Sequence, residues 1–395
     1  MGSILNFIYS DSKKINGYES SNDYCRFTRG PLNQFIQKSS KISNTIDYEI
    51  LPDYKNFFLI ELDHIEKILK TNVFDSIPLS FLEKISNNSV TLLIVSIGET
   101  SDFSNNVFDN LEKLLLTYNI DASNVHLIDS NFDVCKYDSK FKRYNSLHYL
   151  LTDNLSDAGM NELNYISEVP TIDKAKTHKI RTKHFLSLNR QNKPHRYLLL
   201  HHVHNNKLYD KFYISYLTTA SSFGIDNDYD FSKFENDINK TIPIELDTHT
   251  CDDKGGFFPG NTMSHHYLDS YFNIVTETFF SKPISTFTEK IVKPIIGLQP
   301  FIVISTPYYL RNLKSLGFKT FDSIWDESYD LIENDDSRIG KIFNLIDEIS
   351  SWDIEYCDKV YKSVLDICIY NRNHLYNLYD DGEFEKILNK IVNEC

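Results

Sequence analysis

One segment constrains the fold of this chain more than any other, because strand-type and helix-type stretches alternate within residues 269–330. An apolar run, YFNIVTE (271–277), leads to Thr-Glu-Lys at 288–290, then to a helix-type run, KIVKPIIGL (290–298), and to a second apolar run, PFIVIS (300–305). Such a strand–helix–strand unit is typical of a parallel α/β sheet. Free N–H groups and the dipole at a helix start attract anions, so the segment also predicts an anion site where the helix begins.

The length of the chain points to more than one folded unit. At 395 residues it exceeds the size of one typical hydrophobic core, and we expect two domains. Hydrophobic content of 41% and charged content of 24% are ordinary for globular proteins. No apolar run reaches the ~18 residues of a transmembrane helix, so we expect no membrane span. We place the domains at residues 1–165 and 166–345, followed by C-terminal helices at 346–395.

The first half of the chain has its own alternating pattern. Strand-type runs occur at residues 56–62, 89–97 and 125–128, and a run with apolar residues at helical spacing lies between them at 108–118. The run SVTLLIVSI at 89–97 is rich in β-branched residues, as in a strand covered on both faces. This order predicts a parallel α/β domain. The first fifty residues are polar, and we expect them to be largely irregular.

The second half begins after a polar stretch at 167–182, which we interpret as a linker. Short strand-type runs follow at 184–189 and 212–217, and the segment at 222–262 is polar and turn-rich. Together with the strand–helix–strand unit, these runs predict a second parallel α/β domain. From about residue 331 onward the pattern is helical.

The net charge and the cysteine pattern bear on which partners the protein can bind and on its cellular compartment. The net charge of −14 disfavours a broad contact surface for nucleic acid, although it leaves room for a local basic cleft. None of the six cysteines forms a CxxC pair, so neither a zinc site nor a disulfide framework is expected. The N-terminus lacks the pattern of a secretory signal. These features favour reduced thiols and a cytoplasmic location.

A cluster of basic residues follows the strand-type run at 184–189. Asn189 ends the run and Arg190 follows it, and Lys193 and Arg196 fall at the start of a helix-type run. Basic side chains at a helix N-terminus oppose the dipole, so their placement favours an anionic ligand, and the guanidinium fork matches phosphate oxygens. The alternative is a solvated helix start that carries surface charges.

A second candidate set combines carboxylates and an ammonium. Glu277 ends a buried-type strand, where a carboxylate seldom stands without a partner, and it could accept hydrogen bonds from ribose hydroxyls. Lys290 could neutralise a diphosphate, with Glu289 beside it. The alternative is ordinary helix capping, with Thr288 as N-cap and Glu289 in the first turn, although Lys290 fits that interpretation less well.

Glu99 follows the strand-type run at 89–97. Catalytic groups often lie at the carboxyl ends of parallel strands, and a carboxylate there could act as general base toward a hydroxyl. A plain turn with a solvent-facing glutamate is the slightly favoured alternative.

Two sequence patterns give only weak support for a metal-binding site. Asp226 and Asp228 match the Asp-x-Asp spacing that can hold a divalent cation, but they lie in a polar stretch without a preceding buried strand, and a solvated acidic loop is favoured. His201 and His204 share a helix face, yet no further ligands can be named, so a surface or half-buried face is preferred.

Several common site motifs are absent from the sequence. There is no GxGxxG fingerprint, no GxxxxGK[ST] loop and no GxSxG elbow, which disfavours a standard dehydrogenase, a P-loop NTPase and an α/β-hydrolase. With 13 glycines in the whole chain, a glycine-rich phosphate cradle is not expected. Side-chain cations must then neutralise any bound phosphate.

An ordered set of motifs gives the chain a resemblance. Eight short motifs follow one another within residues 184–330, in the order FLSLN, an arginine, HR, FYISY, YFNIVTET, TEK, PFIVIS and GFKTF. This order resembles glycosyltransferases of the GT-B architecture, of viral and bacterial type, and is distantly similar to the α1,3-fucosyltransferase family. The resemblance implies Arg196 (or Arg190) and Lys290 on the donor diphosphate, Glu289 on the ribose or the donor sugar, and Glu277 nearby. The tyrosine that the family has before Thr-Glu-Lys is Phe287 here, so a contact through its phenol oxygen is lost.

The resulting expectation is an α/β protein with two Rossmann-like domains, a cleft between them and a helical C-terminal tail that packs back on the N-terminal domain. That domain would take the acceptor, and the C-terminal domain would take a nucleotide sugar. We expect transfer of the sugar to a glycan or other hydroxyl acceptor, without metal or cofactor. Two alternatives stay open: a non-catalytic carbohydrate- or nucleotide-binding protein on the same scaffold, and a metal-dependent transferase using Asp226 and Asp228. Frequent Asn, Ile, Lys and Tyr hint at an AT-rich source such as a virus.

Overall fold

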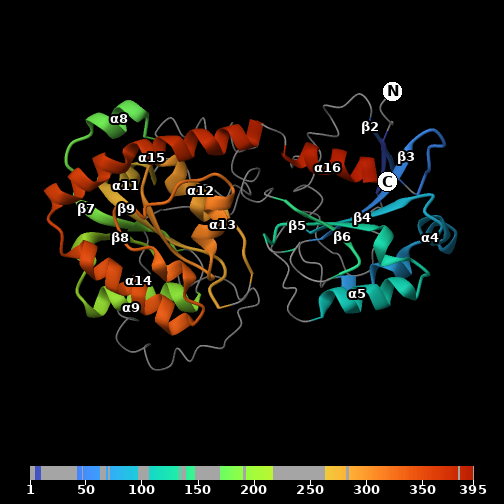
Figure 1. Cartoon of the computed structure of the whole chain (residues 1–395), viewed down its shortest axis with the longest axis horizontal. Coiled ribbons are helices and arrows are strands. Elements are labelled where there is room, and N and C mark those ends of the chain that lie inside the picture. Colours follow the sequence, from blue (N-terminus) through green and yellow to red (C-terminus); the bar gives the residue numbers. More distant parts are fainter. Residues whose placement is uncertain are drawn as a thin grey trace. The chain divides into compact units, whose positions relative to one another are not determined.

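The computed structural model describes residues 5–9, 42–46, 48–62, 68–69, 72–96, 106–132, 134, 139–146, 170–189, 193–216, 263–281, 284–380 and 383–394. The chain divides into two compact units, shown with their elements in Figure 1. The first unit comprises Met1–Ala158, Pro283–Thr286 and Leu378–Cys395, and the second comprises Gly159–Lys282 and Phe287–Asn377.

A six-stranded sheet forms the centre of the first unit. Its order is β2-β1-β3-β4-β5-β6, and every pair of neighbours is parallel. The strands are β1 (Leu5–Tyr9), β2 (Ile42–Ile46), β3 (Lys55–Leu62), β4 (Thr91–Ser96), β5 (Val125–Asp129) and β6 (Lys142–Asn145). The helices are α4 (Leu79–Ser86), α5 (Val107–Leu116) and α16 (Glu383–Glu394), with 3₁₀ turns at Val73–Ser76 and Ala122–Asn124.

Alternating side chains of this sheet supply two separate cores. Ile8, Phe58 and Ile94 lie in the core that also holds apolar residues of α4 and α5. Phe7, Phe57 and Val95 lie in the other core, which contains Leu388 and Ile391 of α16. Successive residues of a strand point to opposite faces, and both faces of this sheet are covered. Runs such as TLLIVS therefore bury nearly every position. In Figure 1, α5 and α16 lie on opposite sides of the sheet.

The second unit contains a four-stranded parallel sheet in the order β10-β9-β7-β8. The strands are β7 (Lys183–Ser187), β8 (Phe212–Ile214), β9 (Ser270–Thr276) and β10 (Phe301–Ile304). The helices are α8 (Ile172–Thr177), α9 (Pro194–Asn205), α11 (Met263–Asp269), α12 (Glu289–Ile296), α13 (Tyr309–Ser315), α14 (Asp335–Ser350) and α15 (Ile354–Asp380), with 3₁₀ turns at Tyr209–Lys211 and Ser328–Leu331. Figure 1 shows α9 and α14 on one side of the sheet and α15 on the other.

The strand order of this second sheet determines where a ligand can enter. The chain runs from β7 to its neighbour β8, and then crosses to the other side of β7 to form β9 and β10. In open α/β sheets, ligands bind outside the carboxyl ends of the strands at the point where the strand order reverses. That point lies between the ends of β7 and β9.

The α/β class with parallel sheets and helices is confirmed, but three local predictions differ from the structure. The first fifty residues were expected to be irregular, but they contain β1 and β2, which pair with each other, and β1 also pairs with β3. These strands are held by hydrogen bonds to their neighbours, and such bonds cannot be recognised in a short polar stretch of sequence. The expected linker contains α8. Of the C-terminal helices, α16 packs on the first unit, whereas α15 through Asn377 belongs to the second. Within the second unit, the Tyr361 ring of α15 packs on the Arg181 guanidinium, with 4.1 Å between the guanidinium carbon and the ring centroid.

No described helix combines the length and the apolar character needed to cross a bilayer.

Candidate functional site

Asn189, directly after β7, joins three strands at the switch point. Its side-chain amide donates to Ser187 Oγ at 3.1 Å, and its carbonyl oxygen accepts a hydrogen bond from Thr276 Oγ1 at the end of β9. Its backbone N–H donates to Ser215 Oγ, beyond the end of β8, at 2.9 Å. Asn189 is buried, so its polar groups serve to fix the edge of the sheet.

Helix α9 begins at Pro194, a residue well suited to the first helical position because it lacks an N–H. The next two side chains, His195 and Arg196, are both buried and turn toward β9. His195 Nε2 donates to the Glu277 carbonyl at 2.8 Å, and Arg196 Nη2 donates to the carbonyls of Thr276 at 3.1 Å and Glu277 at 3.3 Å. The start of α9 is therefore tied to the carboxyl end of β9.

The Glu277 carboxylate is held from α12 and α13. Thr288 Oγ1 donates to Oε2 at 2.6 Å, and the Thr288 N–H lies 3.4 Å from Oε1. Tyr309 Oη donates to Oε1 at 2.7 Å. With 1% of its surface exposed, Glu277 is a buried acceptor whose oxygens are occupied by protein donors. This geometry differs from the predicted ribose contact and gives the carboxylate a structural role.

Thr288 is the N-cap of α12, as its residue type predicts, and its Oγ1 accepts from the Lys290 N–H at 3.3 Å. The Lys290 ammonium donates to Thr278 Oγ1 at 3.3 Å and Thr288 Oγ1 at 3.4 Å. Lys290 is partly exposed, unlike Arg196 and Glu277. Its ammonium thus lies at the start of α12, where the N–H groups of the first turn face outward.

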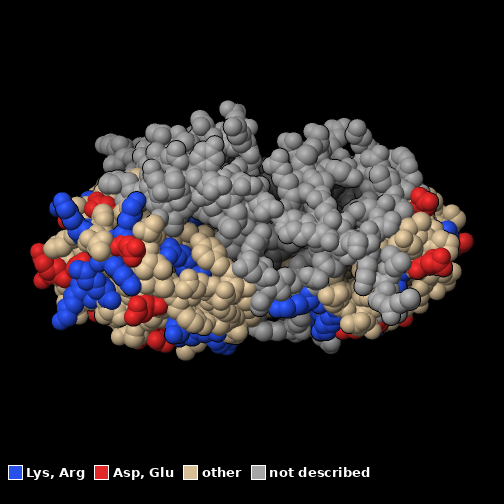
Figure 2. All heavy atoms as spheres, turned by 90° about the horizontal axis from the view of Figure 1, so that it is seen from above, with Lys and Arg blue, Asp and Glu red and all other residues tan. Residues whose placement is uncertain are grey.

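The electrostatics of the site centre on His195. Burial, reinforced by the positive charge of Arg196, holds the pKa of this imidazole well below its usual range; the hydrogen bond to Glu277 opposes the shift, and Lys193 and Lys290 add to it. His195 is therefore neutral and donates from Nε2. Arg196, Lys193 and Lys290 thus all act on one buried, uncharged side chain, and the Glu277 carboxylate lies at the same strand end. On the face shown in Figure 2, by contrast, the lysines and arginines of the described residues are interspersed with acidic residues.

The structure brings four predicted residues into one neighbourhood, namely Asn189, Arg196, Glu277 and Lys290. Others lie outside the described part of the chain: Glu99, Arg190, Asp226, Asp228 and the side chain of Glu289. Sequence reasoning missed Thr276 and Tyr309. Tyr309 follows β10 closely, and its position just beyond the carboxyl end of a predicted parallel strand could have identified it.

The histidine face of α9 is engaged by protein groups. Of the predicted pair, the His201 ring contacts Asn205 one turn along the helix, and His204 Nδ1 lies 3.4 Å from Tyr209 Oη. Among the residues that the structure describes, no group of three or more His, Cys, Asp or Glu side chains is arranged to hold a metal ion.

Comparisons with known proteins gave one loose structural similarity and no match by sequence. No protein-family model matches it, and no curated protein matches its sequence. Among solved structures it is similar to one described as the crystal structure of α1,3-fucosyltransferase with GDP-fucose, at 9% sequence identity and a TM-score of 0.38, over 91% of this chain and 90% of that one. A superposition this loose carries no weight for fold or function.

Proposed function

We propose that the protein is a glycosyltransferase that binds the diphosphate of a nucleotide-sugar donor at the carboxyl edge of its second sheet. The observation that supports this is the connection of two helix starts to one strand end. Arg196 on α9 bonds the Glu277 carbonyl, and Thr288 at the start of α12 bonds the Glu277 carboxylate. Both helices thus direct N-terminal N–H groups and basic side chains toward the switch point, where nucleotide diphosphates bind in open α/β sheets.

In this proposal Lys290 contacts the donor diphosphate directly, because its ammonium is partly exposed at the start of α12. Arg196 and Glu277 act by position: they hold the two helix starts, and Arg196 contributes positive charge from below the surface. Arg190 and Glu289 keep their predicted roles on the diphosphate and on the ribose or sugar.

The chemistry follows from that arrangement. The bond between the anomeric carbon and the diphosphate oxygen breaks, and the acceptor oxygen forms the new bond to that carbon. The departing nucleoside diphosphate takes the bonding electrons, and its negative charge is stabilised by Lys290 and by the N–H groups of α12. The acceptor hydroxyl loses its proton to a carboxylate, the role that the sequence predicts for Glu99. We propose that these cations make a metal ion unnecessary.

A nucleotide panel tests the proposal. We expect UDP, GDP or ADP, and not the monophosphate CMP, to raise the melting temperature of the protein, since a ligand that binds only the folded state stabilises it by about 2.7 kcal/mol at 100 times its Kd. The corresponding nucleotide sugar should then be consumed when a hydroxyl acceptor is present, with full activity in excess EDTA. A thermal shift without consumption of any donor would instead identify a non-catalytic binding protein. Activity lost in EDTA and restored by Mg²⁺ or Mn²⁺ would favour the metal-dependent alternative.

A further inference from the structure

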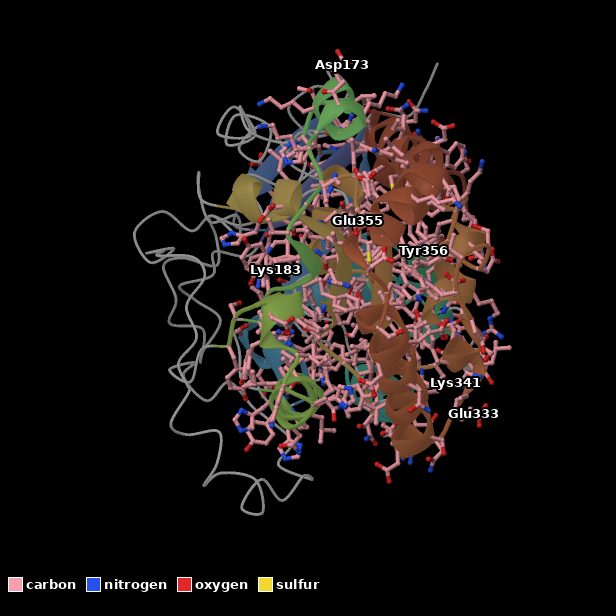
Figure 3. The ribbon with its side chains drawn as sticks, turned by 90° about the vertical axis from the view of Figure 1, so that its left-hand side faces the viewer. Asp173, Lys183, Glu333, Lys341, Glu355 and Tyr356 are labelled. Carbon is pink, nitrogen blue, oxygen red and sulfur yellow. The ribbon has the colours of Figure 1, made fainter. Side chains whose placement is uncertain are left out.

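A pocket lies within the second unit, at the opposite edge of its sheet from the proposed donor site. It has a volume of about 400 Å³ and is lined by residues that precede β7 and β8 or begin those strands, together with the start of α15. Figure 3 labels Lys183 on β7, and Glu355 and Tyr356 in the first turn of α15, the two elements that border it. Since donor ligands of open α/β sheets bind at the carboxyl edge, this pocket is separate from the donor site.

His184 supplies a hydrogen-bond acceptor to this pocket. Its Nε2 lies 2.9 Å from the Trp352 carbonyl, which can only accept, so Nε2 carries the proton. Burial holds the pKa of His184 below its usual range, and the ring is neutral. Nδ1 therefore carries a lone pair, and within the described part of the chain no group donates to it. The side chain is 3% exposed, and an unsatisfied buried acceptor costs about 1–3 kcal/mol.

The other polar groups of the pocket carry both signs of charge. Asp353 accepts from the Tyr356 N–H through Oδ1 at 2.6 Å, as a cap of α15, and Asp210 adds a second, exposed carboxylate. Lys211 faces the same pocket, and its ammonium lies 3.6 Å from Asp210 Oδ2. Arg181 adds a buried guanidinium whose Nη1 donates to the carbonyls of Tyr267 and Ser270, and whose Nη2 has no acceptor among the described residues. The pocket thus presents a neutral acceptor, two carboxylates, an ammonium and a guanidinium.

Trp352 adds an aromatic wall. Its ring is partly exposed and is held edge-on by Phe272, with centroids 6.1 Å apart, and by Tyr356 at 5.1 Å. A ring fixed in this way offers a flat apolar surface next to the polar groups.

We propose that this pocket binds carbohydrate, with ring hydroxyls on the polar groups and an apolar sugar face against Trp352. A phosphate or carboxylate ligand would meet Asp210, Asp353 and the lone pair of His184 Nδ1. A metal ion or organic cation would meet the Lys211 ammonium. Hydroxyl groups both donate and accept, so they match the mixed set: they donate to Nδ1 and the carboxylates and accept from Lys211. Nδ1 is closed to bulk water, so a hydroxyl reaches it only after a small movement of the side chains that line the pocket.

The test measures binding of methyl glycosides of glucose, galactose, mannose, fucose and N-acetylglucosamine to the full chain by saturation-transfer NMR. At least one should bind with a Kd of roughly 1–10 mM, as expected for about a dozen ligand heavy atoms. Trp352→Ala should weaken that binding about tenfold, in keeping with the loss of one aromatic contact. Asp353→Asn should weaken it several-fold, because asparagine keeps the helix cap and removes the charge.

Lys290→Met is the matched control, since it alters the proposed donor site and should leave glycoside binding unchanged. Failure of the nucleotide panel therefore does not decide this proposal, and failure here does not decide the donor site. The proposal is overturned if no glycoside binds, or if Trp352→Ala and Asp353→Asn bind as the parent does. It is also overturned if sodium phosphate or tetramethylammonium chloride binds in this pocket and the glycosides do not.

Discussion

Thr288 donates a 2.6 Å hydrogen bond to Glu277 and so joins the N-cap of α12 to the carboxyl end of β9. The same Thr288 hydroxyl accepts from the Lys290 N–H, so one side chain both caps the helix and holds the buried carboxylate. Because Glu277 also accepts from Tyr309, the starts of two helices are fixed by one acidic group. A buried glutamate without partners would be costly. Here its hydrogen bonds to Thr288 and Tyr309 offset that cost and fix the two helix starts at the candidate site.

Lys290→Met should remove the cation that we place on the donor diphosphate. Hydrogen bonds to charged groups contribute about 1.5–3 kcal/mol, so the affinity for the stabilising nucleotide should fall about 10- to 100-fold. The measurement is the nucleotide concentration that gives half of the maximal thermal shift. Lys293→Met, on the same helix, should leave that concentration unchanged. Equal effects of the two variants would show that general positive charge, rather than the Lys290 position, binds the nucleotide.

Tyr309→Phe should destabilise the second unit, because it takes one donor from a carboxylate that is 1% exposed. The expected loss is about 1.5–3 kcal/mol in the free energy of unfolding, the range for hydrogen bonds to charged groups. Tyr308 provides a matched control, since its hydroxyl donates to Glu333 at 2.7 Å on the exposed surface. Tyr308→Phe should give no resolvable change in urea unfolding. If both variants unfold alike, Glu277 does not depend on the Tyr309 hydroxyl.

Sequence reasoning predicted much of the second sheet because each strand is a compact apolar run next to a helix with a clear start. The runs at 184–189, 271–277 and 300–305 correspond to β7, β9 and β10, and Thr288 to an N-cap. What it could not predict is the direction of the polar side chains. Arg196 has the residue type of an exposed phosphate ligand, yet its guanidinium is buried on backbone carbonyls.

The same limit applies to pairings between distant parts of the chain. Glu277 was singled out as a carboxylate that needs a partner, but Tyr309 comes 32 residues later, and only the fold brings the two together. The short strands β1 and β2 were missed for a related reason. Their stability comes from ladder hydrogen bonds to neighbouring strands and, for β1, from the packing of Leu5 and Phe7 in the core that holds α16, and a local pattern displays neither.

His126 should make the first unit less stable in mild acid. Burial first, and then the charge of Lys142, lower its pKa from the ordinary 6.5 to about 4, against a smaller opposing effect of Glu394. Between those values the unfolded chain binds a proton that the folded chain does not, so stability falls as the pH decreases from about 6.5 to about 4. His126→Gln cannot titrate and should flatten that pH dependence in circular dichroism. Tyr144→Phe removes the hydroxyl 2.9 Å from Nδ1 but keeps the imidazole, and should retain the slope.

Leu388→Ala should destabilise the first unit through the packing of α16. Leu388 is 1% exposed in the core with Phe7 and Phe57, and truncation of a buried leucine costs about 2–5 kcal/mol. Ile387→Ala should cost less, because Ile387 is only partly buried. The two tryptophans of the chain, Trp325 and Trp352, both belong to the second unit, so tryptophan fluorescence follows that unit and circular dichroism follows both. In urea, the Leu388→Ala transition should begin earlier by circular dichroism, with an unchanged midpoint by fluorescence. Equal losses in the two variants would contradict the burial of the Leu388 side chain between α16 and the sheet.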